Sequence, residues 1–301
     1  LLISMAKMRD MNASSNKGKL VICPTPLGNL GDVTQRSLDA FSSCDVVCCE
    51  DTRVTGKLLS ALGLRKPLER LDEATISHKA EVIAQRVLSG EVIAYASDAG
   101  MPGVSDPGLR LVDAARNVSA AVEVLPGPTA VTTAYVASGF TAQSFYFGAF
   151  FPRKVGERQK LLSSLKSLNA VLVFYESPLR IVSALQTVQE VFPLRRVAVC
   201  RELTKLHEEV VRGSVDEVLH IFKQRQEEGS IKGEIALVID APNEEESQAV
   251  VEDALVSAEN RVSELLKDST YSKKDIVKIL KEEFGLSRND AYELVHSSQS
   301  E

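Results

Sequence analysis

Short apolar runs alternate with helical patterns along this chain, and no other feature constrains its fold as strongly. Four apolar runs in the first half each end in a loop rich in Pro, Gly or charged residues: Lys19–Cys23, Asp45–Cys49, Val92–Ala96 and Ala121–Leu125. Helical patterns lie around them, at Thr34–Ser43, Arg53–Leu62, Ser77–Leu88 and Pro107–Arg116. Continuous apolar runs are typical of strands that are covered on both faces. The alternation therefore predicts an α/β fold with a mostly parallel, helix-covered sheet.

The second half repeats this pattern with different loops. Strand patterns lie at Phe145–Phe151, Ala170–Tyr175, Arg196–Cys200, His207–Val211 and Ile235–Asp240. A basic loop is expected at Arg153–Arg158, and helices at Gln159–Leu168 and from Leu179 to Val188. We therefore expect two α/β domains, residues 19–126 and 127–242. Residues 1–18 are polar beyond Ile3 and predict a disordered tail or the remnant of a targeting peptide.

A helix-only segment is expected at the carboxyl end, residues 243–301. The acidic stretch from Pro242 to Gln248 is the best candidate for a linker. Ser272 with Asp275, and Ser287 with Asp290, have the spacing of helix starts. The two helices resemble a helix-turn-helix and carry five basic residues, namely Lys273, Lys274, Lys278, Lys281 and Arg288. Either they contact nucleic acid, or they are a solvated pair packed on the body.

Composition excludes several classes of protein. The 301 residues are 44% apolar and 25% charged, which is ordinary for a globular protein. No apolar run approaches the roughly 20 residues needed to span a bilayer, so no membrane contact is expected. The net charge of −6 provides no global basic field, which counts against nucleic-acid binding without excluding it.

The cysteines predict neither disulfides nor a metal site. There are five, an odd number, and none forms a CxxC pair; the four histidines are scattered. Most of the cysteines lie in or beside apolar runs. We expect buried, reduced thiols in an intracellular protein and no metal ion.

The densest cluster of turn residues, Ala96–Gly108 (ASDAGMPGVSDPG), directly follows an expected strand. Glycine allows the backbone to approach a ligand closely, and proline stiffens the loop. In open α/β sheets, small molecules bind at the carboxyl ends of strands. The stretch therefore predicts a small-molecule site, with an elaborate solvent-exposed turn as the alternative.

Several familiar catalytic motifs are absent. The chain has no GxxxxGK[ST], no GxGxxG after its first strand, no GxSxG and no HExxH. Charged residues gather instead at strand ends, where each could also be a helix cap or part of a surface ion pair. A cleft lined by backbone-rich loops with few nucleophiles suits a reaction in which a bound cofactor brings the reactive group.

Six motifs occur in the order seen in the ribosomal RNA small subunit methyltransferase I family, a branch of the tetrapyrrole methylase superfamily. They are Pro24–Asp32 (PTPLGNLGD), Glu50–Gly56 (EDTRVTG), Ser97–Gly108 (SDAGMPGVSDPG), Pro126–Ala130 (PGPTA), Phe174–Pro178 (FYESP) and Arg201–Lys205 (RELTK). The chain resembles this family over about residues 19–242, and its Lys-rich helical tail is similar too.

This resemblance implies a two-domain tetrapyrrole-methylase-like fold with a small helical C-terminal appendage. It implies that S-adenosylmethionine binds between the domains and that the protein is a homodimer. It also implies methyl transfer to the 2′-hydroxyl of a cytidine ribose in small-subunit ribosomal RNA, with the RNA or the 30S-type subunit as partner. The compartment would be the cytoplasm in a bacterium, or the chloroplast or another organelle in a eukaryote.

The same resemblance implies which residues hold the cofactor. Ser97–Met101 would form the floor on its methionine side, and Thr129 and Ala130 would contact it by backbone and hydroxyl. The full expected set is Pro26, Gly28, Ser97, Asp98, Ala99, Gly100, Met101, Thr129, Ala130, Phe174 and Tyr175. Met101 departs from the family pattern, in which a threonine is expected; a backbone contact would survive this change, whereas a hydroxyl contact would be lost.

The substrate side is carried over in the same way. Transfer to a ribose hydroxyl needs an acceptor for its proton and cations for the flanking phosphates. Expected catalytic residues are Glu50, Asp51, Arg53 and Glu202, and expected substrate-binding residues are Asn29, Glu176, Arg180, Arg201 and Lys205. As an alternative, Arg201 and Glu202 simply pair with each other. Competing functions are methylation of a tetrapyrrole-type small molecule or a protein, and a non-catalytic module that binds the cofactor.

Overall fold

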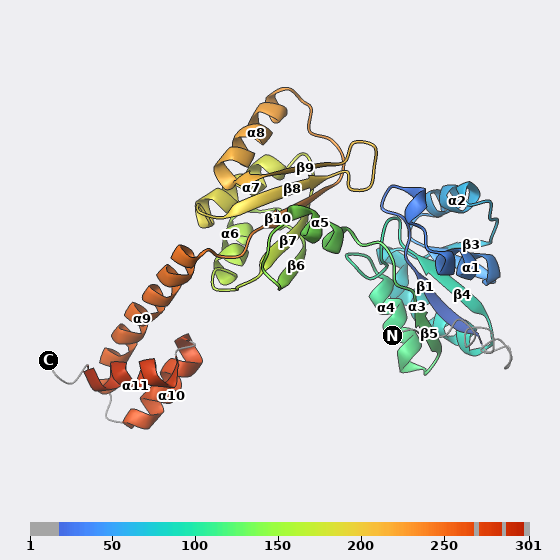
Figure 1. The fold of residues 1–301 in the computed structure, drawn as a ribbon. Helices are drawn as coiled ribbons and strands as arrows, with labels where there is room; N and C mark the ends of the chain where they lie inside the picture. The colour runs from blue at the N-terminus through green and yellow to red at the C-terminus, as the bar shows by residue number, and fades with distance from the viewer. Residues whose placement is uncertain (1–17, 268–270, 285–286, 298–301) are drawn as a thin grey trace, which may run out of the picture.

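The computed structural model describes residues 18–267, 271–284 and 287–297 (Figure 1). Two five-stranded sheets, each with its own helices, are followed by a helical segment that projects from the second sheet. We call the sheets with their helices the first and second lobes, and the last three helices the appendage. The expected tail lies outside the described residues except for Gly18, which is buried directly before the first strand. The domain limits 19–126, 127–242 and 243–301 stay predictions.

The first sheet is parallel throughout, as the sequence predicts. Its strands run in the order β3-β2-β4-β1-β5. They are β1 (Lys19–Cys23), β2 (Val46–Cys49), β3 (Leu68–Arg70), β4 (Val92–Ala96) and β5 (Ala121–Val124). In this register Ala96 lies beside both Cys23 and Cys49. The loops that follow β1, β2 and β4 therefore meet at one edge of the sheet.

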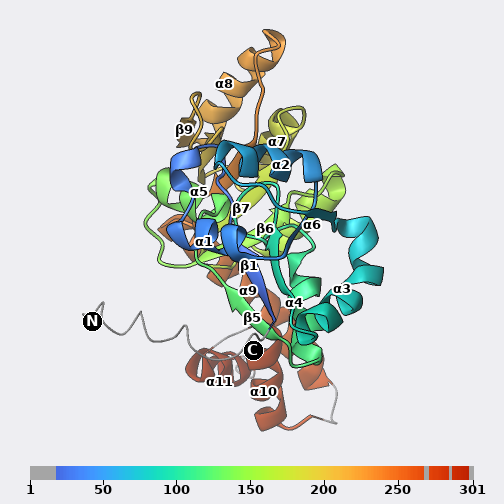
Figure 2. The same cartoon turned by 90° about the vertical axis from the view of Figure 1, so that its right-hand side faces the viewer.

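Helices cover both faces of the first sheet because its strands are apolar on both sides. They are α1 (Gln35–Ser43), α2 (Thr52–Ala61), α3 (Glu73–Leu88) and α4 (Gly108–Asn117), while the short 3-10 helix η3 (Leu30–Asp32) lies in the loop after β1 and buries no residue. Tyr95 faces a core formed with α3 and α4, and Ala94 faces the opposite core with α1 and α2. In Figure 2, β1 accordingly lies between α1 and the pair α3–α4. Helix α3 begins four residues before the predicted Ser77, because Asp72 and Thr75 form a capping box.

The second sheet differs from the pattern expected by analogy with the first half. Its order is β6-β7-β10-β8-β9, and only β6 and β7 are parallel. The strands are β6 (Phe145–Phe150), β7 (Val171–Glu176), β8 (Arg196–Arg201), β9 (Glu209–Ser214) and β10 (Ile235–Ile239). The last strand inserts between β7 and β8 and runs antiparallel to both. A short loop makes β8 and β9 an antiparallel pair, which apolar periodicity alone does not reveal.

Four helices pack on the second sheet. Helix α5 (Ala130–Ser138) covers one face, and α6 (Val155–Ser164), α7 (Ile181–Val191) and α8 (Val215–Glu227) cover the other. The sequence pattern does not predict α5 or α8. The basic loop expected at Arg153–Arg158 is wrong in part, because α6 begins at Val155, and this helix ends before the predicted Leu168.

The appendage consists of α9 (Glu244–Lys267), α10 (Lys273–Phe284) and α11 (Arg288–Ser297), which share a separate apolar core. Figure 1 shows α9 leading away from the second lobe, with α10 and α11 packed at its far end. The linker predicted from Pro242 to Gln248 is wrong in part, because α9 begins at Glu244 and only Pro242 and Asn243 of this segment precede the helix. The predicted helix start at Ser272 is confirmed by reciprocal hydrogen bonds with Asp275. Within the described residues, no helix has the length and apolarity that crossing a bilayer requires.

Candidate functional site

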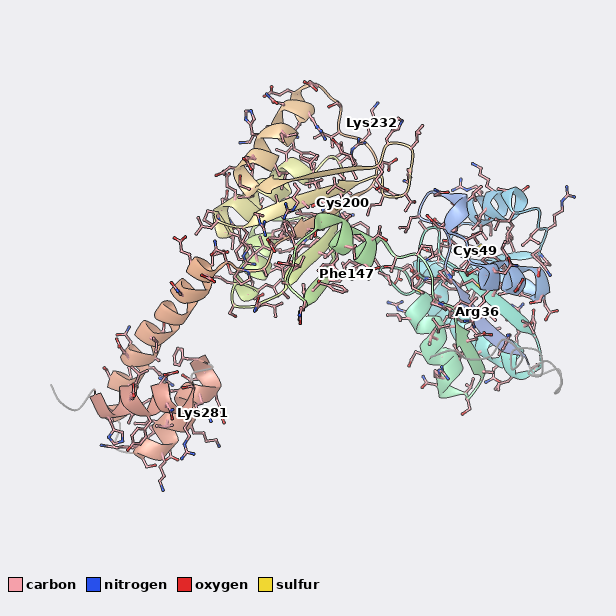
Figure 3. All side chains as sticks on the ribbon, viewed as in Figure 1. Arg36, Cys49, Phe147, Cys200, Lys232 and Lys281 are labelled. Atoms are coloured by element: carbon pink, nitrogen blue, oxygen red, sulfur yellow. The ribbon has the colours of Figure 1, made fainter. Side chains whose placement is uncertain are left out.

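A cavity of about 410 Å³ lies between the two lobes. The first lobe lines it with residues from the loops after β1, β2 and β4. The second lobe lines it with the start of α5, the ends of β6, β7 and β8, the loop after β8, and the start of β10 with the residues before it. The volume lies within the range of small-molecule sites, about 300–1,000 Å³. Figure 3 labels one residue near each wall of the cavity. Cys200 lines the cavity from the second lobe, and Cys49, in the first lobe, directly precedes the lining residue Glu50.

The floor of the cavity is the stretch that the sequence singled out. Thr25 and Gly100 exchange two backbone hydrogen bonds of 3.0 and 3.1 Å, which tie this loop to the first one. The Ser97 hydroxyl donates to the Gly100 carbonyl at 3.1 Å. Gly100 has φ +82°, and a Cβ there would lie 3.0 Å from the Leu27 side chain. A glycine is therefore needed for the turn that presents the backbone of Asp98–Met101 to the cavity.

At this floor, two carboxylates from neighbouring loops each accept a hydrogen bond from the backbone of the other loop. The backbone N–H of Asp98 donates to Glu50 Oε1 at 3.2 Å, and the backbone N–H of Asp51 donates to Asp98 Oδ1 at 3.2 Å. Burial raises the pKa of Glu50 to about 7 and also raises the pKa of Asp98. Both groups therefore hold protons more readily than exposed carboxylates do.

The lining of the cavity is strongly acidic. Five carboxylates line it, those of Glu50, Asp98, Asp106, Glu176 and Glu234, and no Lys, Arg or His is among the described lining residues. Glu176 and Glu234 are paired with cations outside the lining, which leaves the first three without an ion pair among the described residues. Asp106 holds the loop by accepting the backbone N–H groups of Gly103 and Gly108 at 2.8 Å. Excess negative charge around an enclosed space attracts a cationic ligand and repels an anionic one.

Most of the residues expected at the cofactor come together here. Ser97, Asp98, Ala99, Gly100, Met101, Thr129, Ala130 and Tyr175 line the cavity. Pro26 and Gly28 do not line it, although Leu27 between them does. Gly28 instead approaches the second lobe, where an added Cβ would lie 2.2 Å from Lys205 Cγ.

The expected placement of Phe174 in the cofactor site needs correction. Its side chain is fully buried and packs against Phe151, with ring centroids 4.6 Å apart, in the core beneath α6–α8. Successive side chains of a strand point to opposite faces, so Phe174 and Tyr175 cannot both face the cavity. Tyr175 faces it, and burial raises the pKa of Tyr175 to about 12.

Of the expected catalytic residues, only Glu50 lines the cavity. Asp51 caps α2 by accepting the Arg53 backbone N–H at 2.8 Å and pairs with the Arg53 guanidinium at 2.6 Å. This pairing holds the pKa of Asp51 well below its usual range. Glu202 binds Lys205 at 2.9 Å and accepts the Glu234 backbone N–H at 2.8 Å. Asp51 and Glu202 thus have evident structural roles.

The expected substrate-binding cations are all engaged in ion pairs. Lys205 also pairs with Glu234, Arg180 with Glu176 at 2.6 Å, and Arg201 with Glu209 at 3.2 Å. The alternative in which Arg201 pairs with Glu202 is therefore wrong. Glu176 is buried at the edge of the cavity, and burial raises its pKa. Asn29 is exposed and caps η3 by accepting the Gly31 backbone N–H at 2.9 Å.

Sequence reasoning missed several residues that line the cavity. Asp106 lies inside the motif Ala96–Gly108, and the Asp-Pro-Gly turn that it begins is the sequence signal that could have identified it. Phe150, Leu203 and Glu234 carry no comparable signal, because they reach the cavity through the arrangement of the second sheet. All five cysteines are buried with free thiols, as the sequence predicts. The described residues contain no group of three or more His, Cys, Asp or Glu placed to hold a metal ion.

Comparisons with known proteins agree on one family. The family model described as tetrapyrrole (corrin/porphyrin) methylases matches residues 19–219. The chain is 41% identical to ribosomal RNA small subunit methyltransferase I of Thermotoga maritima, over 71% of this chain and 96% of that protein. It is 34% identical to the protein of the same name from Halalkalibacterium halodurans, over 97% of this chain and 99% of that protein.

Solved structures show the same fold at lower identity. A diphthine synthase matches with a TM-score of 0.58 and 14% identity, covering 77% of this chain and 93% of that one. A cobalt precorrin-4 methyltransferase matches with a TM-score of 0.54 and 16% identity, covering 73% of this chain and 94% of that one. The two sheets and the helices around them are thus a known architecture.

Proposed function

Because the chain belongs to the ribosomal RNA small subunit methyltransferase I family of tetrapyrrole methylases, we propose that it transfers a methyl group from S-adenosylmethionine to small-subunit ribosomal RNA. We further propose that the acceptor is the 2′-hydroxyl of a cytidine ribose. The protein would act as a homodimer wherever such ribosomes are assembled, in a bacterial cytoplasm or in a chloroplast or other organelle.

The observation that carries this proposal is the acidic cavity between the lobes. S-adenosylmethionine combines a sulfonium and an ammonium with one carboxylate, so it is cationic overall. Five lining carboxylates, three of them without an ion-pair partner among the described residues, suit such a ligand. Leu27, Val104 and Leu203 offer apolar surface for its adenosine part. The residues present therefore fit this cofactor. Our proposed contacts to the cofactor are Ser97–Met101, Thr129, Ala130 and Tyr175. At Met101, where the family pattern has threonine, we propose that the backbone makes the contact.

Glu50 is the residue that we propose as the general base. When bound, the cofactor supplies an electrophilic methyl group on its sulfonium. A hydroxyl acceptor must lose its proton during the transfer, and Glu50 is the one expected base that reaches the cavity. Its pKa of about 7 makes it a stronger proton acceptor than an ordinary carboxylate while it remains partly ionised at neutral pH. Asp98 supports it through the hydrogen bond from its backbone N–H.

Cations around the cavity would hold the RNA backbone. Arg53, Arg201 and Lys205 remain our candidates for phosphate contacts, with Asn29, Glu176 and Arg180 near the acceptor. Because these cations are already paired with carboxylates, a phosphate would have to replace or join an existing partner. The Arg53 side chain is 85% exposed, so its pair with Asp51 is the one that an RNA phosphate would reach most easily.

Methyl transfer to separate acceptors tests the proposal. Purified protein and S-adenosylmethionine labelled on the methyl group are incubated with unmodified small ribosomal subunits, free ribosomal RNA and total protein. We expect label in RNA, in a dinucleotide that resists alkaline hydrolysis, because a 2′-O-methyl group blocks cleavage at that ribose. Label on protein or on a small molecule alone would refute the proposal in favour of those substrates. Cofactor binding without transfer to any acceptor would favour a non-catalytic module.

A further inference from the structure

Phe150 is an aromatic residue at the cavity with no part in the proposed cofactor contacts. It lines the cavity from the end of β6, yet it is 60% exposed. Its ring lies edge-on to Tyr175, with centroids 5.5 Å apart and an interplanar angle of 68°. Phe147 contacts Tyr175 in a similar way, with ring centroids 5.0 Å apart, so Tyr175 contacts two aromatic rings of β6. Phe150 therefore belongs to a fixed aromatic cluster but keeps much of its own surface open.

A local irregularity in β6 directs Phe150 to the cavity. In the parallel pairing of β6 with β7, Phe147 lies beside Val173 but Phe150 lies beside Tyr175, so β6 contains one extra residue. Because side chains alternate along a strand, an even register would turn Phe150 toward the core beneath α6–α8. The extra residue turns Phe150 to the cavity face of the sheet, and Phe151 packs in the core beneath α6–α8 instead.

The backbone of β6 is unusual at this point. Ala149 adopts φ +55°, which is uncommon for a residue with a Cβ. A Cβ on Gly148 would lie 2.1 Å from the Phe174 ring, so this position accepts only glycine. Bulges of this kind often lie next to active sites, where they redirect a side chain.

The charge of the cavity restricts which part of an RNA can approach Phe150. Three lining carboxylates, those of Glu50, Asp98 and Asp106, have no ion-pair partner among the described residues, and no described lining residue is a cation, so entry of a phosphate is unfavourable. A ribose hydroxyl can then reach the cavity only if its nucleotide turns out of the chain, with the phosphates left outside. An extruded base needs an uncharged surface at the entrance, and aromatic rings are the surface on which proteins commonly stack single-stranded bases.

We propose that Phe150 is the stacking surface for the nucleobase of the nucleotide that is methylated. This inference rests on the proposed RNA methyltransferase function and assigns a positioning residue to it. The adenine of the cofactor is the competing occupant of the same ring, and the test separates the two.

The test compares Phe150→Ala and Phe150→Tyr with the wild type and with Phe145→Ala. Phe145 is a matched control because it is a partly exposed aromatic residue of the same strand, packs on Tyr135 and is not among the cavity residues. For each protein, KM for RNA, kcat, the Kd of S-adenosylmethionine by calorimetry and the melting temperature are measured.

We expect Phe150→Ala to raise KM for RNA about 5-fold to 100-fold, with the Kd of the cofactor unchanged within about twofold. Phe150→Tyr should retain the wild-type KM, and Phe145→Ala should not raise it. A KM for RNA unchanged in Phe150→Ala, or a Kd of the cofactor raised by the same factor as KM, would overturn the inference. If the wild type labels no RNA, the proposed function itself fails and this inference fails with it. If the wild type labels RNA but Phe150→Ala has an unchanged KM for RNA, only this inference fails.

Discussion

Glu50 shows how the position of one side chain sets its chemistry. It follows β2 directly, is partly buried beside Asp98, and has a pKa raised by burial to about 7. Below pH 7 it is mostly protonated and cannot accept a proton. We therefore expect kcat/KM for the cofactor, which reports the free enzyme, to rise about tenfold between pH 6 and pH 8.

Two variants assign this pH dependence to Glu50. In Glu50→Gln the rise should disappear along with most of the activity. Asp51→Asn is the control, because Arg53 keeps the pKa of Asp51 so low that it stays ionised over this range. An identical pH profile in Glu50→Gln and the wild type would show that another group is the base.

Gly148 is a second position at which a single atom, an added Cβ, is expected to change stability. An added Cβ would lie 2.1 Å from the Phe174 ring, which is fully buried in the core. We expect Gly148→Ala to lower the free energy of unfolding by about 1–3 kcal/mol in urea denaturation. Gly156→Ala in α6 is the control, since nothing lies within 4 Å of its added Cβ, and it should gain about 0.4–1 kcal/mol. Equal stability of the two variants would mean that the β6 bulge is not constrained as described.

At the scale of elements, the start of α9 is fixed by a buried ion pair. Arg195 has a fully buried side chain, stacks on Phe192 at 3.7 Å, and donates to Glu246 in the first turn of α9 at 3.1 Å. Loss of one partner leaves the other charge buried and uncompensated. We expect Arg195→Met to lower the free energy of unfolding by about 3–5 kcal/mol, as measured by chemical denaturation.

The neighbouring arginine provides the comparison for this prediction. Arg196 pairs with Asp240 at 2.6 Å, but its side chain is 52% exposed, so Arg196→Met should cost less than about 1 kcal/mol. The double variant Arg195→Met with Glu246→Leu should recover most of the stability, because a buried pair replaced by apolar residues is often neutral. A loss in the double variant as large as in Arg195→Met would point to packing of the arginine rather than to the ion pair.

Elements that are buried on both faces were the ones that the sequence predicted well. The runs at Lys19–Cys23 and Val92–Ala96 coincide with β1 and β4, because a strand covered on both sides is apolar throughout. Strand β3 was not predicted because its three residues, LER, are half-buried or exposed and so form no apolar run. Helix α5 escaped because it is apolar around much of its circumference and has no amphipathic stripe.

At the scale of the whole molecule, the carboxyl ends of parallel strands explain why the floor of the cavity was predictable. Glu50 and Asp98 are far apart in sequence but follow the neighbouring strands β2 and β4, so a parallel sheet brings them together. The second wall was not predictable in the same way. Strand β10 inserts between β7 and β8, and the β6 bulge decides that Phe150 faces the cavity. Both depend on pairings between segments distant in sequence, which local patterns do not encode.

The central claim is that the acidic cavity between the lobes binds a cationic cofactor, and calorimetric titration of S-adenosylmethionine tests it most directly. Asp98 lines the cavity, whereas Asp51 caps α2 outside it, and an asparagine at either position keeps a hydrogen-bond acceptor. We predict binding of the cofactor to the wild type, an affinity about tenfold lower or weaker still in Asp98→Asn, and an unchanged affinity in Asp51→Asn. Equal affinities in all three proteins, or no binding to the wild type, would contradict the account.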